Sequence, residues 1–115
     1  MPTDCLFCKI VAGDVPAEVV HEGERTLAFR DISPAAPTHV LVIPRDHHTD
    51  VAALAQADPS VLVELFRAAG DVARSDGLDA TGYRLVTNTG RDAQQSVQHV
   101  HLHVLGGRHL SWPPG

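Results

Sequence analysis

The stretch "HVHLHV", residues 99–104, alternates three histidines with three aliphatic residues. Side chains at every second position of a β-strand share one face. The spacing therefore predicts a strand with His99, His101 and His103 on one side, roughly 6.6 Å apart, and the aliphatic residues in the core. Three imidazoles on one face are unusual for a strand that is merely half-exposed. The pattern favours either a metal site or a site that handles an anion and its protons.

The rest of the chain combines strand and helix patterns. Apolar residues recur at helical spacing from Asp58 to Gly77, with Pro59 at the first helical position. A shorter helix is expected around Leu6 to Val11, before Gly13. The apolar stripe of the long helix comprises Val61, Leu62, Leu65, Phe66, Ala69 and Val72. Besides the histidine strand, strands are expected within 17–23, 25–32, 38–44 and 82–90.

The order of these elements shows no repeated alternation of parallel strands and helices. It favours an α+β fold with a five-stranded antiparallel sheet, one long helix and one short helix. The 115 residues are expected to form a single domain, 1–115. The net charge of −5 and the scattered charges argue against nucleic acid as a partner, and the apolar stretches are too short to span a membrane. A cytoplasmic protein is expected.

A polar loop at 88–96 precedes the histidine strand and points to phosphate chemistry. Asn88, Gln95 and Ser96 supply amide and hydroxyl groups that can bind a phosphate. An imidazole can attack phosphorus, flanking imidazoles can bind the oxygens, and a hydroxyl such as that of Ser96 can relay a proton. The central His101 is the best-placed nucleophile. One of its ring nitrogens must then be held as a donor, and we expect a backbone carbonyl to accept that bond.

Cys5 and Cys8 form a C-x-x-C pair on one face of the expected short helix. Such a pair is half of a tetrahedral zinc site, and any of the eight histidines could complete it. The alternative is a pair of small buried thiols. A thioredoxin-like redox pair is disfavoured because no βαβ unit surrounds it.

Two further residues have two interpretations each. Asp31 follows an expected strand, where a carboxylate could accept ribose hydroxyls, but it also suits a turn before Ser33-Pro34. Trp112, the single tryptophan, could cover a pocket or an interface, or the tail could pack on its own domain.

The motif "HVHLHV" resembles the His-x-His-x-His signature of the histidine-triad (HIT) nucleotide-binding proteins. Residues 7–47, "GYRLVTNTG" at 82–90, "QSVQHVHLHVLGGR" at 95–108 and the tail "WPPG" resemble the Hint branch nearly end to end. The resemblance implies a five-stranded antiparallel sheet with two helices, and a homodimer in which each tail reaches toward the partner's active site. It also implies hydrolysis of purine nucleoside phosphoramidates such as adenosine monophosphoramidate.

The same resemblance assigns roles to individual residues. His101 would be the nucleophile that carries a transient nucleotidyl group, with His99, His103 and His39 in support and Ser96 assisting the leaving amine. Asp31 and Ile32 would contact the ribose. The full set implied to bind an AMP-like or GMP-like nucleotide is Phe7, Ile10, Asp31, Ile32, Leu41, Asn88, Gln94, Gln95, Ser96, His101 and His103.

The chain departs from the Hint pattern in two places. Members often carry Gly-Gly before the Gln-Ser pair, whereas Ala93-Gln94 stand here, so a side chain could narrow the phosphate site. Many members also lack the early cysteines. Zinc-bearing bacterial HIT proteins resemble the chain there, and their pattern implies a structural zinc held by four ligands: Cys5, Cys8, His47 and His99.

Two other functions remain open at this point. The first is a catalytic metal hydrolase with His99, His101 and His103 as ligands. The outer two residues would lie about 13 Å apart, too far for bonds of about 2.1 Å to one metal. The second is a nucleotide-binding adaptor with little turnover, which the sequence does not exclude.

Overall fold

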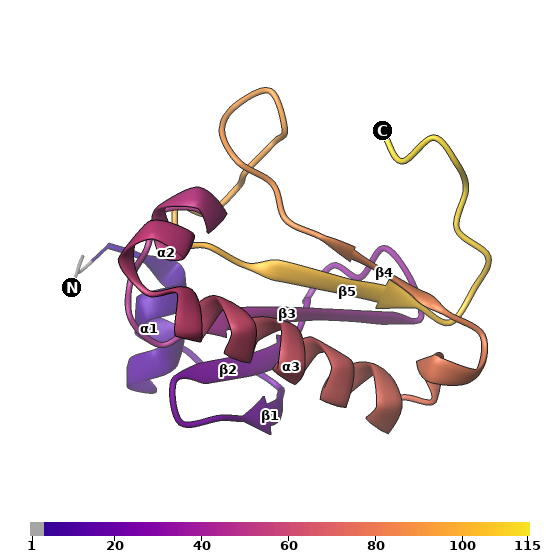
Figure 1. Cartoon of the computed structure of the whole chain (residues 1–115). Helices are drawn as coiled ribbons and strands as arrows, with labels where there is room; N and C mark the ends of the chain where they lie inside the picture. The colour runs from indigo at the N-terminus through magenta and orange to yellow at the C-terminus, as the bar shows by residue number, and fades with distance from the viewer. Residues whose placement is uncertain (1–3) are drawn as a thin grey trace.

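The computed structural model describes residues 4–115, and its five strands form one antiparallel sheet in the order β1-β2-β3-β5-β4 (Figure 1). The strands are β1 (Val19–Glu22), β2 (Thr26–Arg30), β3 (Thr38–Pro44), β4 (Tyr83–Val86) and β5 (Leu102–Gly106). The predicted α+β class and the five-stranded antiparallel sheet are confirmed. Within the described residues, no helix has the length and apolar character needed to cross a membrane.

Three α-helices accompany the sheet: α1 (Leu6–Ala12), α2 (Val51–Ala57) and α3 (Pro59–Ser75). Gly13 ends α1 in a left-handed conformation with φ 82°, which glycine adopts without strain. Helix α2 was not predicted from the sequence. Its local signal is Asp50, whose Oδ1 accepts a hydrogen bond of 2.9 Å from the backbone N–H of Ala53 and so caps the helix.

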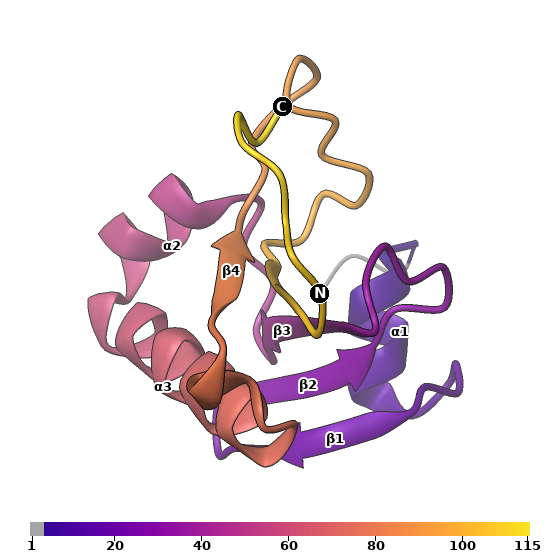
Figure 2. The same cartoon turned by 90° about the vertical axis from the view of Figure 1, so that its right-hand side faces the viewer.

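The sheet is covered on both faces, with α3 on one side and α1 on the other (Figure 2). All seven residues of β3 are buried, and they alternate between two cores. Val40 and Val42 pack in the core under α2 and α3, while Leu41 and Ile43 pack in the core under α1. The middle strand therefore separates a helical core from the core next to the cysteines.

The apolar stripe of α3 differs from the predicted one at Phe66, which is 47% exposed. Ala68 and Ala73 are buried instead, together with the predicted Leu65 and Val72. Small alanine side chains let the helix lie close to the sheet, and at this rotation the Phe66 ring faces solvent.

The histidine strand is shorter than predicted, because β5 begins only at Leu102. The backbone just before it has other partners than a neighbouring strand. The N–H of Val100 donates to the carbonyl oxygen of His48 at 2.7 Å, and the carbonyl of His99 accepts a bond from the His101 ring at 2.8 Å. These bonds replace the ladder of a regular strand, so two of the three histidines lie on the segment that leads into β5.

Candidate functional site

His101 is held as a neutral imidazole with one free nitrogen. Its Nδ1 lies 2.8 Å from the carbonyl oxygen of His99, and a carbonyl can only accept, so Nδ1–H donates. Burial lowers the pKa of His101, which is 4% exposed. The edge-on ring of Phe7, with centroids 5.1 Å apart, fixes the imidazole further. The lone pair of Nε2 is thus available for attack, and the predicted carbonyl partner is present.

His39 and His103 form a chain of hydrogen bonds whose proton positions follow from its first member. The N–H of Ala35 donates to His39 Nδ1 at 3.0 Å, so the proton of the neutral ring is on Nε2. That Nε2–H donates to His103 Nδ1 at 2.9 Å, with a carboxylate oxygen of Asp31 3.5 Å away. His103 must then carry its proton on Nε2. This atom is the buried side-chain polar atom without a partner in the described chain.

The Nε2–H of His103 is thus a buried donor without an acceptor among the described residues. A buried donor without a partner is costly, and such groups in folded proteins are associated with ligand binding. The ring stays neutral, because burial first, and then the neighbouring His101 and His39, lower the pKa of His103 to about 4. A phosphoryl oxygen would satisfy this donor beside His101, whose ring centroid is 5.0 Å away.

Asp31, His39 and His103 place one ligand atom each within 4.8 Å of one another, which raises the question of a metal. The proton positions argue against it. A metal on His39 Nε2 would have to displace a proton from a ring whose Nδ1 already accepts the Ala35 N–H, leaving an imidazolate. We therefore interpret this group as a proton-ordering chain.

The second cluster, formed by Cys5, Cys8, His47 and His99, fits a tetrahedral zinc ion. Its four ligand atoms also lie within 4.8 Å of one another. The Sγ to Nδ1 distances are 3.5 Å for Cys5–His99 and Cys8–His99, and 3.4 Å for Cys8–His47. Bonds of about 2.3 Å to sulfur and 2.0 Å to nitrogen at tetrahedral angles place such atoms about 3.5 Å apart. The donor set and these three distances match a tetrahedral zinc ion.

The protonation of His99 also suits a metal ligand. Its Nε2–H donates to the carbonyl oxygen of Pro44 at 2.9 Å, which leaves Nδ1 unprotonated and facing the two sulfurs. Burial lowers the pKa of His99 to about 4, so the ring is neutral. Without a metal, burial first and then Cys5 raise the pKa of the Cys8 thiol to about 11. A cation would replace that proton.

His99 connects the cysteine cluster to His101. Its ring faces the cysteines, while its backbone carbonyl holds the Nδ1–H of His101. Phe7 contacts both rings edge-on, with centroid distances of 5.8 Å and 5.1 Å. An ion that held the His99 ring would therefore also restrain the residue whose carbonyl orients the His101 ring.

The predicted nucleotide contacts lie in several environments. Phe7, Ile10 and Leu41 come together in the core under α1. Ile32, by contrast, is 96% exposed. The side chain of Asp31 stabilises a turn, the second interpretation given for it above, because its Oδ1 accepts a hydrogen bond of 2.8 Å from the backbone N–H of Ser33.

The loop before the histidines is braced from within by Gln95. Its amide oxygen accepts from Gly90 N–H at 3.0 Å, and its amide nitrogen donates to the carbonyl oxygens of Thr49 and Val97 at 2.7 and 3.0 Å. Both hydrogens of its amide nitrogen and one lone pair of its amide oxygen are thus already used. Gln94 has φ 61°, the left-handed conformation that glycine favours, at the position where the family often carries glycine. Of the predicted phosphate contacts, Ser96 is exposed and Asn88 is half-buried.

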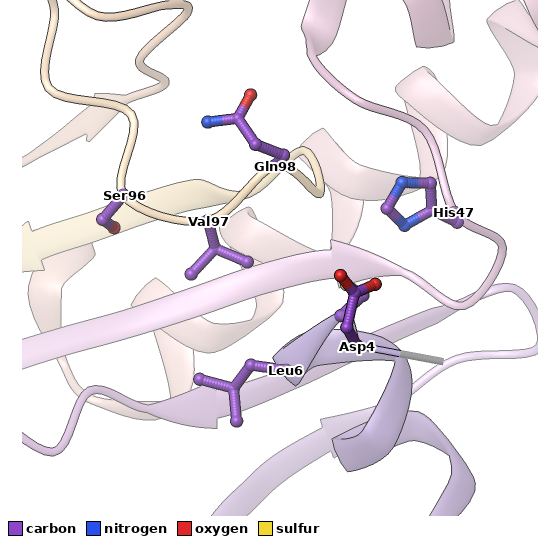
Figure 3. A pocket seen from close by; sticks show the side chains of 7 residues that line it. Asp4, Leu6, His47, Ser96, Val97 and Gln98 are labelled. Carbon is purple, nitrogen blue, oxygen red and sulfur yellow. The ribbon is translucent and has the colours of Figure 1, made fainter. Parts of the chain in front are cut away.

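A pocket of about 500 Å³ opens between the start of α1 and the segment leading into the histidines (Figure 3). Ser96, Cys5 and His47 were predicted site residues, and they line it. No sequence pattern pointed to its other lining residues, which are Asp4, Leu6, Val97 and Gln98.

Comparison with known proteins gives consistent results. A family model described as "HIT domain" matches residues 12–110. The chain is 46% identical over 112 residues to a "14 kDa zinc-binding protein" of Zea mays, covering 96% of this chain and 87% of that protein. A HIT family hydrolase from Legionella pneumophila has a TM-score of 0.93 and 47% identity, covering 97% of this chain and 100% of that one. A HIT family hydrolase from Clostridium thermocellum has the same TM-score at 40% identity, covering 96% of each chain.

Proposed function

Because the chain belongs to the HIT family, we propose that it hydrolyses the P–N bond of purine nucleoside phosphoramidates through a nucleotidyl group on His101. The chain shares its fold with HIT family hydrolases, which supports hydrolase activity in general. The observation that carries the proposal is the pairing of a neutral His101 Nε2 with the unpartnered Nε2–H of His103.

The proposed reaction has two steps. In the first, the Nε2 lone pair of His101 forms a bond to phosphorus while the P–N bond to the amine breaks, and the amine leaves after accepting a proton. The hydroxyl of Ser96 relays that proton from solvent. In the second, water attacks phosphorus as the bond from phosphorus to Nε2 of His101 breaks, one water proton returns to solvent through the Ser96 hydroxyl, and the nucleoside monophosphate departs. His103 donates to a phosphoryl oxygen in both steps.

Zinc is the metal we propose for the cluster of Cys5, Cys8, His47 and His99. Its support is the donor spacing and the zinc-binding name of the maize relative. A bound zinc ion would supply rigidity at the His99 ring. The protein's own residues would do the chemistry, since Nδ1 of His99 faces the sulfurs and Nε2 is occupied by Pro44.

A homodimer is the assembly we propose, joined at an edge of the sheet. In the described chain the edge strands β1 and β4 each pair along one side only, β1 with β2 and β4 with β5. An unpaired edge is a ready template for a second copy. Light scattering on the purified protein would give the mass, and a monomer at micromolar concentration would contradict this assembly.

Single-turnover kinetics on an adenosine phosphoramidate test the catalytic proposal. His101→Ala should lower the rate of amine release by at least a thousandfold, and His109→Ala, at an exposed position, should leave it unchanged. A His101→Ala rate within about threefold of wild type, under 1 kcal/mol, would disprove the nucleophile. Tight binding of AMP with negligible turnover by wild type would instead indicate an adaptor.

A further inference from the structure

We propose that Gln95 is a positioning residue whose side chain holds Ser96 in place for the proton relay. The inference rests on the proposed P–N hydrolysis, in which the Ser96 hydroxyl passes a proton to the leaving amine. It gives Gln95 a different role from the one that the family resemblance implies, which is a nucleotide contact. The hydrogen bonds of the Gln95 amide form a brace within the protein instead.

Ser96 depends on its backbone for a fixed position. Its side chain is exposed, so packing does little to restrain the hydroxyl. It follows a polar loop, and such a loop is mobile unless its backbone is bonded to the rest of the domain. A proton relay works only within hydrogen-bond reach, about 2.6–3.2 Å, so a displacement of about 1 Å slows it. The restraint on Ser96 must therefore come from a neighbouring residue.

Gln95 closes the loop that begins at Gly90. Its backbone N–H donates to the carbonyl oxygen of Gly90 at 3.0 Å, and its amide oxygen accepts from the backbone N–H of Gly90 at 3.0 Å. These two residues are thus joined twice, as a hydrogen-bonded pair on antiparallel strands is. The amide nitrogen of Gln95 also donates to the carbonyl oxygen of Val97 at 3.0 Å. The bonds of one side chain therefore restrain the backbone on both sides of Ser96.

The same amide nitrogen ties the loop to the segment that follows β3. It donates to the carbonyl oxygen of Thr49 at 2.7 Å, and Gln95 is only 9% exposed, so water competes little for this bond. Further along the chain, the N–H of Val100 donates to the carbonyl oxygen of His48 at 2.7 Å. Residues 96–99 are thus held at both ends against one segment. Without the Gln95 amide, the end next to the loop would be released.

These bonds leave Gln95 little capacity to bind a phosphate. A phosphoryl oxygen needs a donor, and both hydrogens of the amide nitrogen are already bonded to carbonyl oxygens. The amide oxygen keeps one lone pair, which a phosphate would repel. The contribution of Gln95 to the reaction therefore passes through Ser96.

Two adenosine monophosphate derivatives with a P–N bond test this inference. A propylamine leaving group needs a proton on the nitrogen that leaves phosphorus, which is the proton that Ser96 relays. An imidazole leaving group takes its proton from solvent on its other ring nitrogen. Gln95→Met should lower kcat about tenfold or more for the propylamine compound and less than about threefold for the imidazole compound, with KM little changed for either. Gln56→Met, the same substitution at an exposed amide on α2, should leave both rates unchanged.

A double variant separates positioning from general damage. If Gln95 acts through Ser96, Gln95→Met should not slow Ser96→Ala further on the propylamine compound, because the two residues act as one unit. Equal slowing of both compounds, a rise in KM for both, or losses that add in the double variant would overturn the inference. If Gln95→Met does not fold, Gln95→Glu replaces it in each assay, since a carboxylate still accepts from Gly90 but cannot donate.

The brace can also be measured without turnover, so a failure of the proposed function is distinguishable. If wild type does not release propylamine, the proposed P–N hydrolysis has failed. The NMR order parameter of the Ser96 backbone amide still tests the brace. It should be about 0.85 in wild type and in Gln56→Met, and below about 0.6 in Gln95→Met. A Ser96 amide that is already mobile in wild type, or that stays rigid in Gln95→Met, would refute the inference.

Discussion

Removing one sulfur ligand should abolish zinc binding while the chain still folds. The perturbation is Cys8→Ala, which deletes the atom that lies 3.4 Å from His47 Nδ1 and 3.5 Å from His99 Nδ1. Three ligands would remain, and the closed tetrahedral set would be lost. We expect the wild type to contain about one zinc per chain and Cys8→Ala to contain less than about a tenth of that.

The stability effect follows from mass action. At free zinc a hundredfold above its Kd, binding stabilises the fold by about 2.7 kcal/mol. For a domain of this size each kcal/mol moves Tm by roughly 3–6 °C, so a chelator should lower the wild-type Tm by roughly 8–16 °C. The Tm of Cys8→Ala should already be low without chelator, and adding the chelator should not change it.

Elemental analysis and thermal unfolding with and without chelator measure both effects. His109→Ala is the matched control, since that histidine is exposed and outside the cluster. The geometric reasoning would be refuted if the wild-type protein bound no zinc when refolded with excess metal and if the chelator left its Tm unchanged. So would a Cys8→Ala protein with full zinc content.

Three further predictions concern stability. Asp76→Asn should lower the free energy of unfolding by about 1.5–3 kcal/mol at pH 7, since Arg30 donates two bonds of 2.9 and 3.1 Å to that carboxylate. Arg30 lowers the pKa of Asp76, so the wild-type advantage should be full above about pH 5 and shrink as pH falls below about 4; a pH-independent difference in denaturant titrations would contradict this. Gln94→Gly should raise stability by about 1 kcal/mol by relieving the left-handed conformation at φ 61°, and a loss measured by chemical unfolding would show that the side chain contributes more than the strain costs. Leu65→Ala, at 1% exposure, should cost about 2–5 kcal/mol, whereas Phe66→Ala, at 47% exposure, should cost under about 1.5 kcal/mol, and equal calorimetric losses would disprove the assigned rotation of α3.

Local patterns were enough to predict much of the fold. Period-two spacing correctly predicted that Val100, Leu102 and Val104 lie in the core. It could not predict where β5 begins, because that depends on the carbonyl of His48, distant in sequence, which takes the N–H of Val100. Helix α3 was predicted by its periodicity and by Pro59, but its rotation was decided by packing against the sheet.

The candidate metal site, too, could be predicted only in part from local patterns. The Cys5-Cys8 spacing indicates half of a metal site, and helical geometry alone supports it. The other half depends on the pairing of β3 with β5, which brings His47, three residues after β3, near His99, three residues before β5. Strand order is a long-range property, so only the family resemblance could identify those two ligands beforehand. The pocket at Asp4 had no local signal at all.

Strand β3 has a consequence for how the protein can change over time. Its successive residues face opposite sides, so Val42 lies with the helices while Leu41 lies among the cysteines and Phe7. Alternate positions of this one strand are therefore under different selection. Residues that face the helices can be replaced by other apolar residues as long as the volume is conserved. Residues that face the cysteines and Phe7 must also keep the neighbouring site intact, so a library that randomises β3 should show tolerance that alternates residue by residue.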